Sequence, residues 1–146
     1  MSDHQKYKFL HPLRVRYNET DAQGRVFFGN YLNYFDVALT EYMRAIDFTY
    51  QDMHDTGMDM FYVEADCQYK GAARFDDLLH VHALVSHIGN TSFTFNFTIF
   101  KMPDDELIAT GHITAVAADL QSEKPMRVPD ELRKAVARYE ENPNNE

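Results

Sequence analysis

Asp21 and the residues after it are the best-placed chemical groups in this sequence. Asp21 lies in the turn-forming run 20–24, between a predicted strand and a helix expected to begin at Gly29 or Asn30. The first amides of a helix have no intrahelical acceptor and carry partial positive charge, so the backbone N–H groups of Phe28, Gly29 and Asn30 could polarise a carbonyl oxygen. A carboxylate a few residues earlier could attack that carbonyl carbon, or activate water to do so. The structural alternative is that Asp21 only caps its own turn.

Histidine and cysteine give a weaker signal. His80 and His82 are two residues apart on one face of a predicted strand, and His112 is expected on a neighbouring strand. A zinc or iron site would add further ligands that the sequence does not place there, so we interpret these histidines as ordinary sheet residues and predict no metal. Cys67 is the single cysteine, which excludes an internal disulfide and suits a reducing compartment.

These groups have to be positioned by strands and helices, which the hydrophobic pattern predicts. The alternation over 13–19 predicts a strand, and apolar residues spaced three and four apart, Leu32 among them, predict a mostly buried helix from Asn30 to about Ile46. The polar segment 47–59 is interpreted as a connection with at most a short helical turn. Methionines around the helix end could line a flexible apolar tunnel, although core packing explains each of them as well. They are Met43, Met53, Met58 and Met60.

Four more strands are expected at 60–73, 78–88, 93–99 and 107–119, followed by a helix that begins near Pro129. The clearest is 93–99, where alternate apolar residues define one face, although they could also line an acyl pocket. The order strand, helix, four strands, helix predicts an α+β fold with an antiparallel sheet of about five strands wrapped around a long central helix, and a short C-terminal helix. We expect residues 1–146 to form one domain with a frayed tail at 140–146.

Composition excludes several classes of protein. The 146 residues are 45% apolar and carry a net charge of -9, which argues against disorder and against non-specific binding to nucleic acid or to an anionic membrane. Residues 36–66 hold eight acids and one base, so most of this charge lies in one segment. No signal peptide or membrane-spanning run is visible, and we expect a cytoplasmic protein.

The run from Tyr17 to Phe35 resembles the signature of the hotdog-fold acyl-CoA thioesterases of the 4-hydroxybenzoyl-CoA thioesterase type. The shared features are an aromatic residue, a Thr-Asp pair, a glycine three residues after the aspartate, and Asn30-Tyr31 at the start of the central helix. The segments Phe75-Asp76-Asp77-Leu78-Leu79 and Ile88-Gly89-Asn90-Thr91-Ser92-Phe93 look like the family's next strand start and hairpin. The resemblance covers roughly residues 12 to 120 and implies the hotdog fold.

The resemblance also implies roles for individual residues. Asp21 would be the catalytic carboxylate, as nucleophile or as general base, and the N–H groups of Phe28 and Gly29 would polarise the thioester carbonyl. Tyr17 stands where many relatives carry a tyrosine near the acid. Two departures are Phe28, where one branch of the family has histidine, and Arg25, where histidine is common. As substrate-binding residues we nominate Arg25, Asn30, Tyr31, Lys70, Arg74 and Ser92.

The sequence therefore predicts hydrolysis of an acyl-CoA or aryl-CoA thioester, without a cofactor, by a homodimer or homotetramer. A non-catalytic acyl-ligand-binding hotdog domain is the alternative, and Asp21 at the motif position argues against it. A hotdog dehydratase would need a histidine beside its acid, and none lies between His11 and His54.

Overall fold

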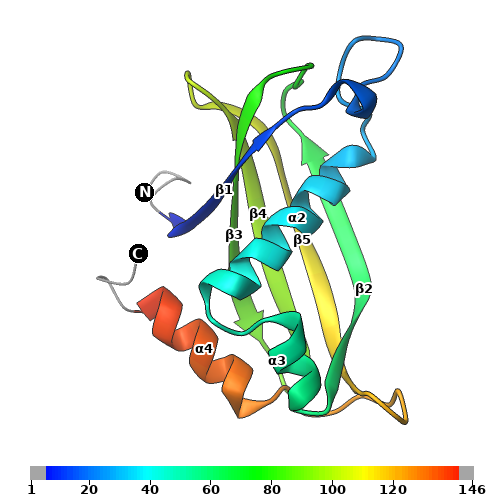
Figure 1. Ribbon diagram of the computed structural model, residues 1–146, viewed down its shortest axis with the longest axis vertical. Coiled ribbons are helices and arrows are strands. Elements are labelled where there is room, and N and C mark those ends of the chain that lie inside the picture. The colour runs from blue at the N-terminus through cyan, green and yellow to red at the C-terminus, as the bar shows by residue number, and fades with distance from the viewer. Residues whose placement is uncertain (1–5, 142–146) are drawn as a thin grey trace.

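A five-stranded antiparallel sheet forms the body of the protein, and the computed structural model describes residues 6–141. The strands are β1 (Phe9–Arg14), β2 (Met58–Tyr69), β3 (Leu78–Ile88), β4 (Ser92–Lys101) and β5 (Glu106–Asp119). Their order across the sheet is β1-β3-β4-β5-β2, so β1 and β2 are the two edges. The sheet curves around helix α2 (Asn30–Ala45), which crosses one face of it (Figure 1). The α+β fold and the order of elements predicted from the sequence are confirmed.

The core lies between α2 and the concave face of the sheet. Alternate residues of β4, namely Phe93, Phe95, Phe97 and Ile99, are all buried, as their spacing predicted. The ring of Phe35 on α2 stacks on that of Phe97 with centroids 4.6 Å apart. Gly111 of β5 permits this approach, because a Cβ there would lie 2.6 Å from the Phe35 ring. The helix therefore rests directly on the sheet.

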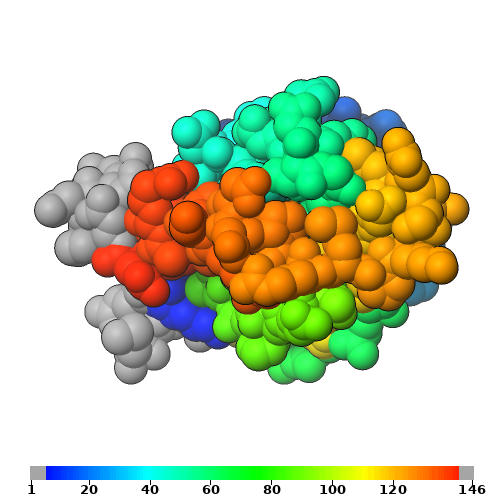
Figure 2. Space-filling view, turned by 90° about the horizontal axis from the view of Figure 1, so that it is seen from below, coloured from blue at the N-terminus to red at the C-terminus, as the bar shows by residue number. Residues whose placement is uncertain are grey.

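Two shorter helices close one end of the molecule. Helix α3 (Tyr50–Asp55) follows α2 and is capped by the Thr49 side chain, which accepts a hydrogen bond from the Asp52 N–H. Helix α4 (Asp130–Glu141) lies across that end, between the segment around α3 and the β3–β4 turn (Figures 1 and 2). Its Glu140 accepts a 2.5 Å hydrogen bond from the Tyr42 hydroxyl, which ties α4 to α2. No helix among residues 6–141 is long and apolar enough to cross a membrane.

The first strand differs from its prediction. The strand was expected at 13–19, but β1 ends at Arg14 and residues Tyr17–Glu19 form a 3-10 turn. The reason is the partner strand: β3 begins at Leu78, which pairs with Arg14, and only Val15 continues the contact, through backbone hydrogen bonds with Asp76 and Asp77. The Glu19 side chain instead accepts the Arg16 backbone N–H at 2.8 Å and closes the turn.

Two other expectations are corrected, and a third concerns residues that are only partly described. Strand β2 ends at Tyr69 rather than at residue 73, because the N–H groups of Lys70 and Gly71 both donate to the Ile108 carbonyl and the chain leaves the ladder there. Leu32, expected on the buried stripe of α2, is exposed. Of the expected tail, residues 140 and 141 belong to α4, and 142–146 lie outside the described residues.

Candidate active site

The turn that carries Asp21 is held by its own backbone and by glycine. The Asp21 N–H donates to the Arg25 carbonyl at 2.8 Å, and the Gly24 N–H donates to the Asp21 carbonyl at 2.9 Å. Gly24 has a φ of +77°, in the left-handed region that favours glycine. The Asp21 Oδ1 accepts the Gln23 N–H at 2.9 Å, so the turn-capping interaction of the structural alternative is present. The carboxylate is thereby fixed in direction on a rigid turn.

Glu19 fastens this turn to the start of α2. Its carbonyl accepts hydrogen bonds from the Phe27 N–H at 2.9 Å and from the Asn30 side-chain amide at 2.9 Å. Its carboxylate accepts the Tyr34 hydroxyl at 3.0 Å. Burial raises the pKa of Glu19, but hydrogen bonds from Arg16 and Tyr34 outweigh it, so the pKa lies below its usual value. Glu19 is therefore an ionised structural anchor.

Asp21 opens onto a hollow of about 230 Å³. The lining joins the Asp21 turn, the start of α2 and the end of β2, and consists of Asp21, Gln23, Arg25, Val26, Phe28, Tyr31, Tyr69, Gly71 and Ala72. The N–H groups of Phe28 and Gly29 have no acceptor within the described part of the chain. Asp21 and Phe28 thus line one hollow, and the free N–H groups of Phe28 and the adjacent Gly29 stand at the start of α2, which is an arrangement able to bind and attack a carbonyl group.

Two tyrosines, Tyr31 and Tyr69, line the hollow together with Asp21. The Tyr69 hydroxyl donates to the Phe28 carbonyl at 3.0 Å, and the Tyr31 hydroxyl accepts the Ala73 N–H at 3.3 Å. Burial raises the pKa of both hydroxyls, so they stay protonated at neutral pH. Burial likewise raises the pKa of the Cys67 thiol, which is therefore no thiolate nucleophile at neutral pH.

The structure brings some of the nominated residues together. Arg25 and Tyr31 line the hollow, and Lys70 follows Tyr69 directly on an exposed stretch. The Arg74 guanidinium lies 3.5 Å from the Gly24 carbonyl, so its charge is beside the Asp21 turn. Asn30 serves the helix start through its bond to Glu19.

Two further nominated residues, Tyr17 and Ser92, also do not line the hollow. Tyr17 is exposed, and its ring contacts Phe75 edge to face at 5.7 Å. Ser92 lies at the opposite end of the sheet: it pairs with Val116 of β5, whereas Tyr69 pairs with Ala109. Seven residues of strand separate those pairs, or roughly 23 Å.

The histidines do not form one cluster. His112 is on β5 and His80 and His82 are on β3, with β4 between them, so the expected neighbouring strands are in fact two apart. His112 contacts two carboxylates, Glu64 at 2.5 Å and Asp66 at 3.0 Å, which the sequence did not place. Among residues 6–141, no group of three or more histidine, cysteine or acidic side chains is arranged to hold a metal ion.

Five lining residues were not nominated from the sequence: Gln23 and Val26 beside the Asp21 turn, and Tyr69, Gly71 and Ala72 at the end of β2. The alternation of β2 could have placed Tyr69 on the same face as Cys67, toward the helix. Nothing local indicates that the end of β2 meets the Asp21 turn. That contact depends on the Val26 N–H, which donates to the Ala73 carbonyl at 2.9 Å across 47 residues of sequence.

Comparison with known proteins decides the family. The profile of the thioesterase-like superfamily matches residues 15–136, which is most of the chain. The chain belongs to the thioesterase-like superfamily. The resemblance drawn from the sequence, to the hotdog-fold acyl-CoA thioesterases, is confirmed, and with it the class of enzyme, a thioester hydrolase.

Individual members of the thioesterase-like superfamily are similar over nearly their whole length. The acyl-CoA thioesterase YbgC of Haemophilus influenzae is 33% identical over 128 residues, covering 87% of this chain and 93% of its own. The crystal structure of a hypothetical protein of Aquifex aeolicus superposes with a TM-score of 0.81 at 31% identity, covering 88% of this chain and 98% of that one. A gentisyl-coenzyme A thioesterase, BH1999, superposes with a TM-score of 0.78 at 27% identity, covering 88% and 100%. The hotdog fold is thus established.

Proposed function

We propose that this superfamily member hydrolyses an acyl-CoA or aryl-CoA thioester at the Asp21 hollow. The observation that carries the proposal is that Asp21 and Phe28 line the same hollow, while the N–H groups of Phe28 and Gly29 are free to donate. The thioester oxygen accepts these N–H groups, which stabilise the negative charge that develops when the carbonyl carbon is attacked. One such donor contributes about 3 kcal/mol to catalysis.

Asp21 supplies the attack in one of two ways. As a general base it takes a proton from water while the water oxygen bonds to the carbonyl carbon. The C–S bond then breaks, the proton held by Asp21 passes to the departing CoA sulfur, and the free acid and CoA leave. As a nucleophile it forms an acyl-aspartyl anhydride as CoA leaves, and water cleaves the anhydride afterwards. No histidine lines the hollow, so neither route uses an imidazole.

We propose that the phosphates of CoA are bound by the cations around the hollow. Arg25 lines it, Lys70 adjoins Tyr69, and Arg74 lies beside Gly24. All three cations lie outside the acidic segment 36–66 of the sequence, and guanidinium and ammonium groups are suited to bind the phosphates of the CoA moiety.

We also propose a homodimer in which β2 pairs with β2 of a second copy. Two observations support it: the character of the two sheet edges, and the position of Ser92 far from the hollow of its own subunit. Edge β2 has 12 residues and exposes Phe61, Tyr62 and Val63, whereas edge β1 has six residues and contains Pro12. Long apolar edges favour strand pairing and a proline opposes it. Antiparallel pairing of β2 would bring Ser92 of the partner subunit to the Asp21 end, where it could contact CoA.

Substitution of the carboxylate tests the mechanism. Asp21→Asn keeps an oxygen that can accept the Gln23 N–H, so the turn should persist, while attack on the thioester is lost. We expect kcat/KM for CoA-thiol release to fall at least about 100-fold, with CoA affinity retained in calorimetry. Asp104→Asn, in the exposed β4–β5 turn, is the matched control and should leave the rate unchanged. An Asp21→Asn enzyme with more than a tenth of wild-type activity would refute the role of Asp21.

The Asx-type bonds of Asp21 favour one alternative, a non-catalytic acyl-ligand-binding domain in which this carboxylate is structural. In that case the wild-type protein would bind CoA esters without releasing CoA from any of them. The same assay therefore separates the two functions.

A further inference from the structure

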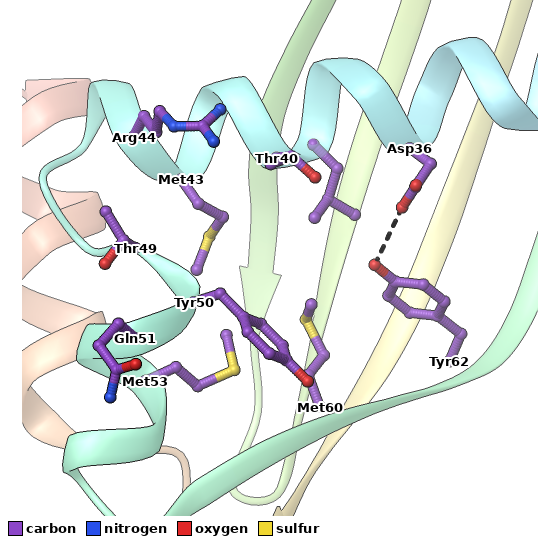
Figure 3. A pocket seen from close by; sticks show the side chains of 11 residues that line it. Asp36, Thr40, Met43, Arg44, Thr49, Tyr50, Gln51, Met53, Met60 and Tyr62 are labelled. Carbon is purple, nitrogen blue, oxygen red and sulfur yellow. Dashed lines mark hydrogen bonds between the residues drawn. The ribbon is translucent and has the colours of Figure 1, made fainter.

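A cavity of about 520 Å³ lies between α2, α3 and β2, away from the Asp21 hollow (Figure 3). It is lined by Asp36, Leu39, Thr40, Met43, Arg44, Thr49, Tyr50, Gln51, Met53, Met60 and Tyr62. Its size is within the range of ligand pockets, about 300–1,000 Å³. The catalytic groups described above do not reach it, so its purpose needs a separate explanation.

The inner wall of this cavity is apolar and deformable. Leu39, Met43 and Met53 are at most 4% exposed, and Met60 adds a third thioether to this wall. Methionine is unbranched and adapts to ligands of varied length. None of these four side chains can ionise or form a strong hydrogen bond, so the inner wall suits an alkyl chain and no polar head group.

The rim of the cavity is polar and acidic. The Tyr62 hydroxyl donates to the Asp36 carboxylate at 3.4 Å, from β2 to α2 across the opening (Figure 3). The only cation in the lining, Arg44, is paired with Glu41. The Asp36 carboxylate at this rim would therefore repel a ligand that ends in a carboxylate. It would not repel an uncharged methyl end.

The cavity and the Asp21 hollow both lie between α2 and β2, toward opposite ends of β2. Within one subunit, Tyr69 at the hollow and Met60 at the cavity are nine strand residues apart, roughly 30 Å. In the proposed dimer, antiparallel pairing about the middle of β2 would set Met60 of the partner subunit opposite Cys67, two residues from Tyr69. The separation along the strand then falls to roughly 7 Å, with about 5 Å more between strands.

An acyl chain can span the shorter distance. An extended alkyl chain advances about 1.3 Å per carbon, given C–C bonds of about 1.5 Å, so about eight carbons reach the cavity of the partner subunit. The 30 Å path within one subunit would need more than about 20 carbons.

We propose that this cavity binds the methyl end of a straight, uncharged acyl chain of about eight or more carbons, whose thioester lies at Asp21 of the other subunit. The proposal rests on the proposed thioesterase function and narrows its substrate to medium- and long-chain acyl-CoA, in preference to aryl, short-chain or ω-carboxylated esters.

The test compares the hydrolysis of acyl-CoA esters of increasing chain length by the wild type and by a variant whose cavity is filled with a larger side chain. Thr40 is exposed on the α2 flank that lines the cavity, so Thr40→Phe should occupy the cavity without disturbing the core. Val37→Phe is the matched control, because Val37 lies on the opposite flank of α2, beside β1 and Tyr17–Glu19. Release of CoA from acetyl-, hexanoyl-, octanoyl-, decanoyl-, suberoyl- and benzoyl-CoA is followed for the wild type and both variants.

We expect wild-type kcat/KM to rise with chain length beyond hexanoyl by about fourfold per methylene, the factor given by about 0.8 kcal/mol per buried CH₂. Thr40→Phe should abolish this rise and leave acetyl-CoA turnover unchanged, while Val37→Phe keeps the wild-type profile. Suberoyl-CoA should be hydrolysed at least tenfold more slowly than octanoyl-CoA, and Asp36→Asn should reduce that ratio.

The outcomes separate the two proposals. If no ester is hydrolysed by the wild type, the proposed function fails and this inference with it. If acetyl- or benzoyl-CoA is hydrolysed but longer chains bring no gain, or Thr40→Phe keeps the wild-type profile, the thioesterase stands and the cavity is not an acyl site.

Discussion

At the scale of single residues, His112 is a titratable group on the outer face of the sheet, away from the proposed chemistry. Its hydrogen bond to Glu64, helped by the negative charge of Asp66, raises the pKa of His112 above 6.5. A raised folded-state pKa stabilises the protein below the unfolded pKa, and that stabilisation is lost as pH rises through the folded pKa. We therefore expect the wild type to exceed His112→Gln in unfolding free energy at pH 5.5, by less than about 1 kcal/mol because the pair is partly exposed.

The measurement is urea unfolding of both proteins at pH 5.5 and 8.5. The difference between them should disappear at pH 8.5, where histidine is neutral in both states. An NMR titration of His112 gives the pKa directly, and a value at or below 6.5 would contradict the argument.

At the scale of elements, the approach of α2 to the sheet depends on Gly111. A Cβ at this position would lie 2.3 Å from the Asp66 carbonyl and 2.6 Å from the Phe35 ring, and neither backbone nor buried ring can move freely. We expect Gly111→Ala to lower the unfolding free energy by about 1–3 kcal/mol, the range for overpacked cores, as measured by the denaturant midpoint.

Thr110→Ala is the control for this prediction, because Thr110 alternates with Gly111 and lies on the other face of β5. It should change the midpoint little. If Gly111→Ala is as stable as the wild type, α2 is not seated against β5 as described.

At the scale of the whole molecule, the two edges of the sheet differ in how well they suit assembly. We expect edge β2 to pair with a second copy of the chain and edge β1 to remain unpaired. Val63 is 60% exposed on the long apolar edge β2, and Leu10 is 40% exposed on the short edge β1. A lysine at an edge disfavours strand pairing. We expect Val63→Lys to convert the proposed dimer to a monomer and to reduce hydrolysis of octanoyl-CoA, because the proposed acyl cavity belongs to the partner subunit.

Light scattering after gel filtration measures the mass, and Leu10→Lys is the matched control that should leave the dimer intact. A Val63→Lys protein that remains dimeric would place the subunit contact elsewhere. A monomeric wild type would exclude the two-subunit acyl site.

Much of the fold follows from patterns that span a few residues. The alternation of phenylalanines predicted β4, the three-and-four spacing predicted α2, and the Asp21 turn and the start of α2 were predicted because their determinants lie within ten residues of one another. The same locality explains why Asp21 and Phe28 could be nominated together.

Only the tertiary structure decided which distant segments meet. The end of β1 was set by where β3 begins, the wall at Tyr69 by a bond from Val26 to Ala73, and the methionine-lined cavity by the packing of three separate elements. The sequence predicted the turn and the central helix correctly and nominated Asp21 as the candidate carboxylate, since backbone propensities and side-chain periods act over short distances. The hollow, the cations around it and the cavity were decided by the tertiary structure, because strand pairing and helix packing join residues that no local pattern relates.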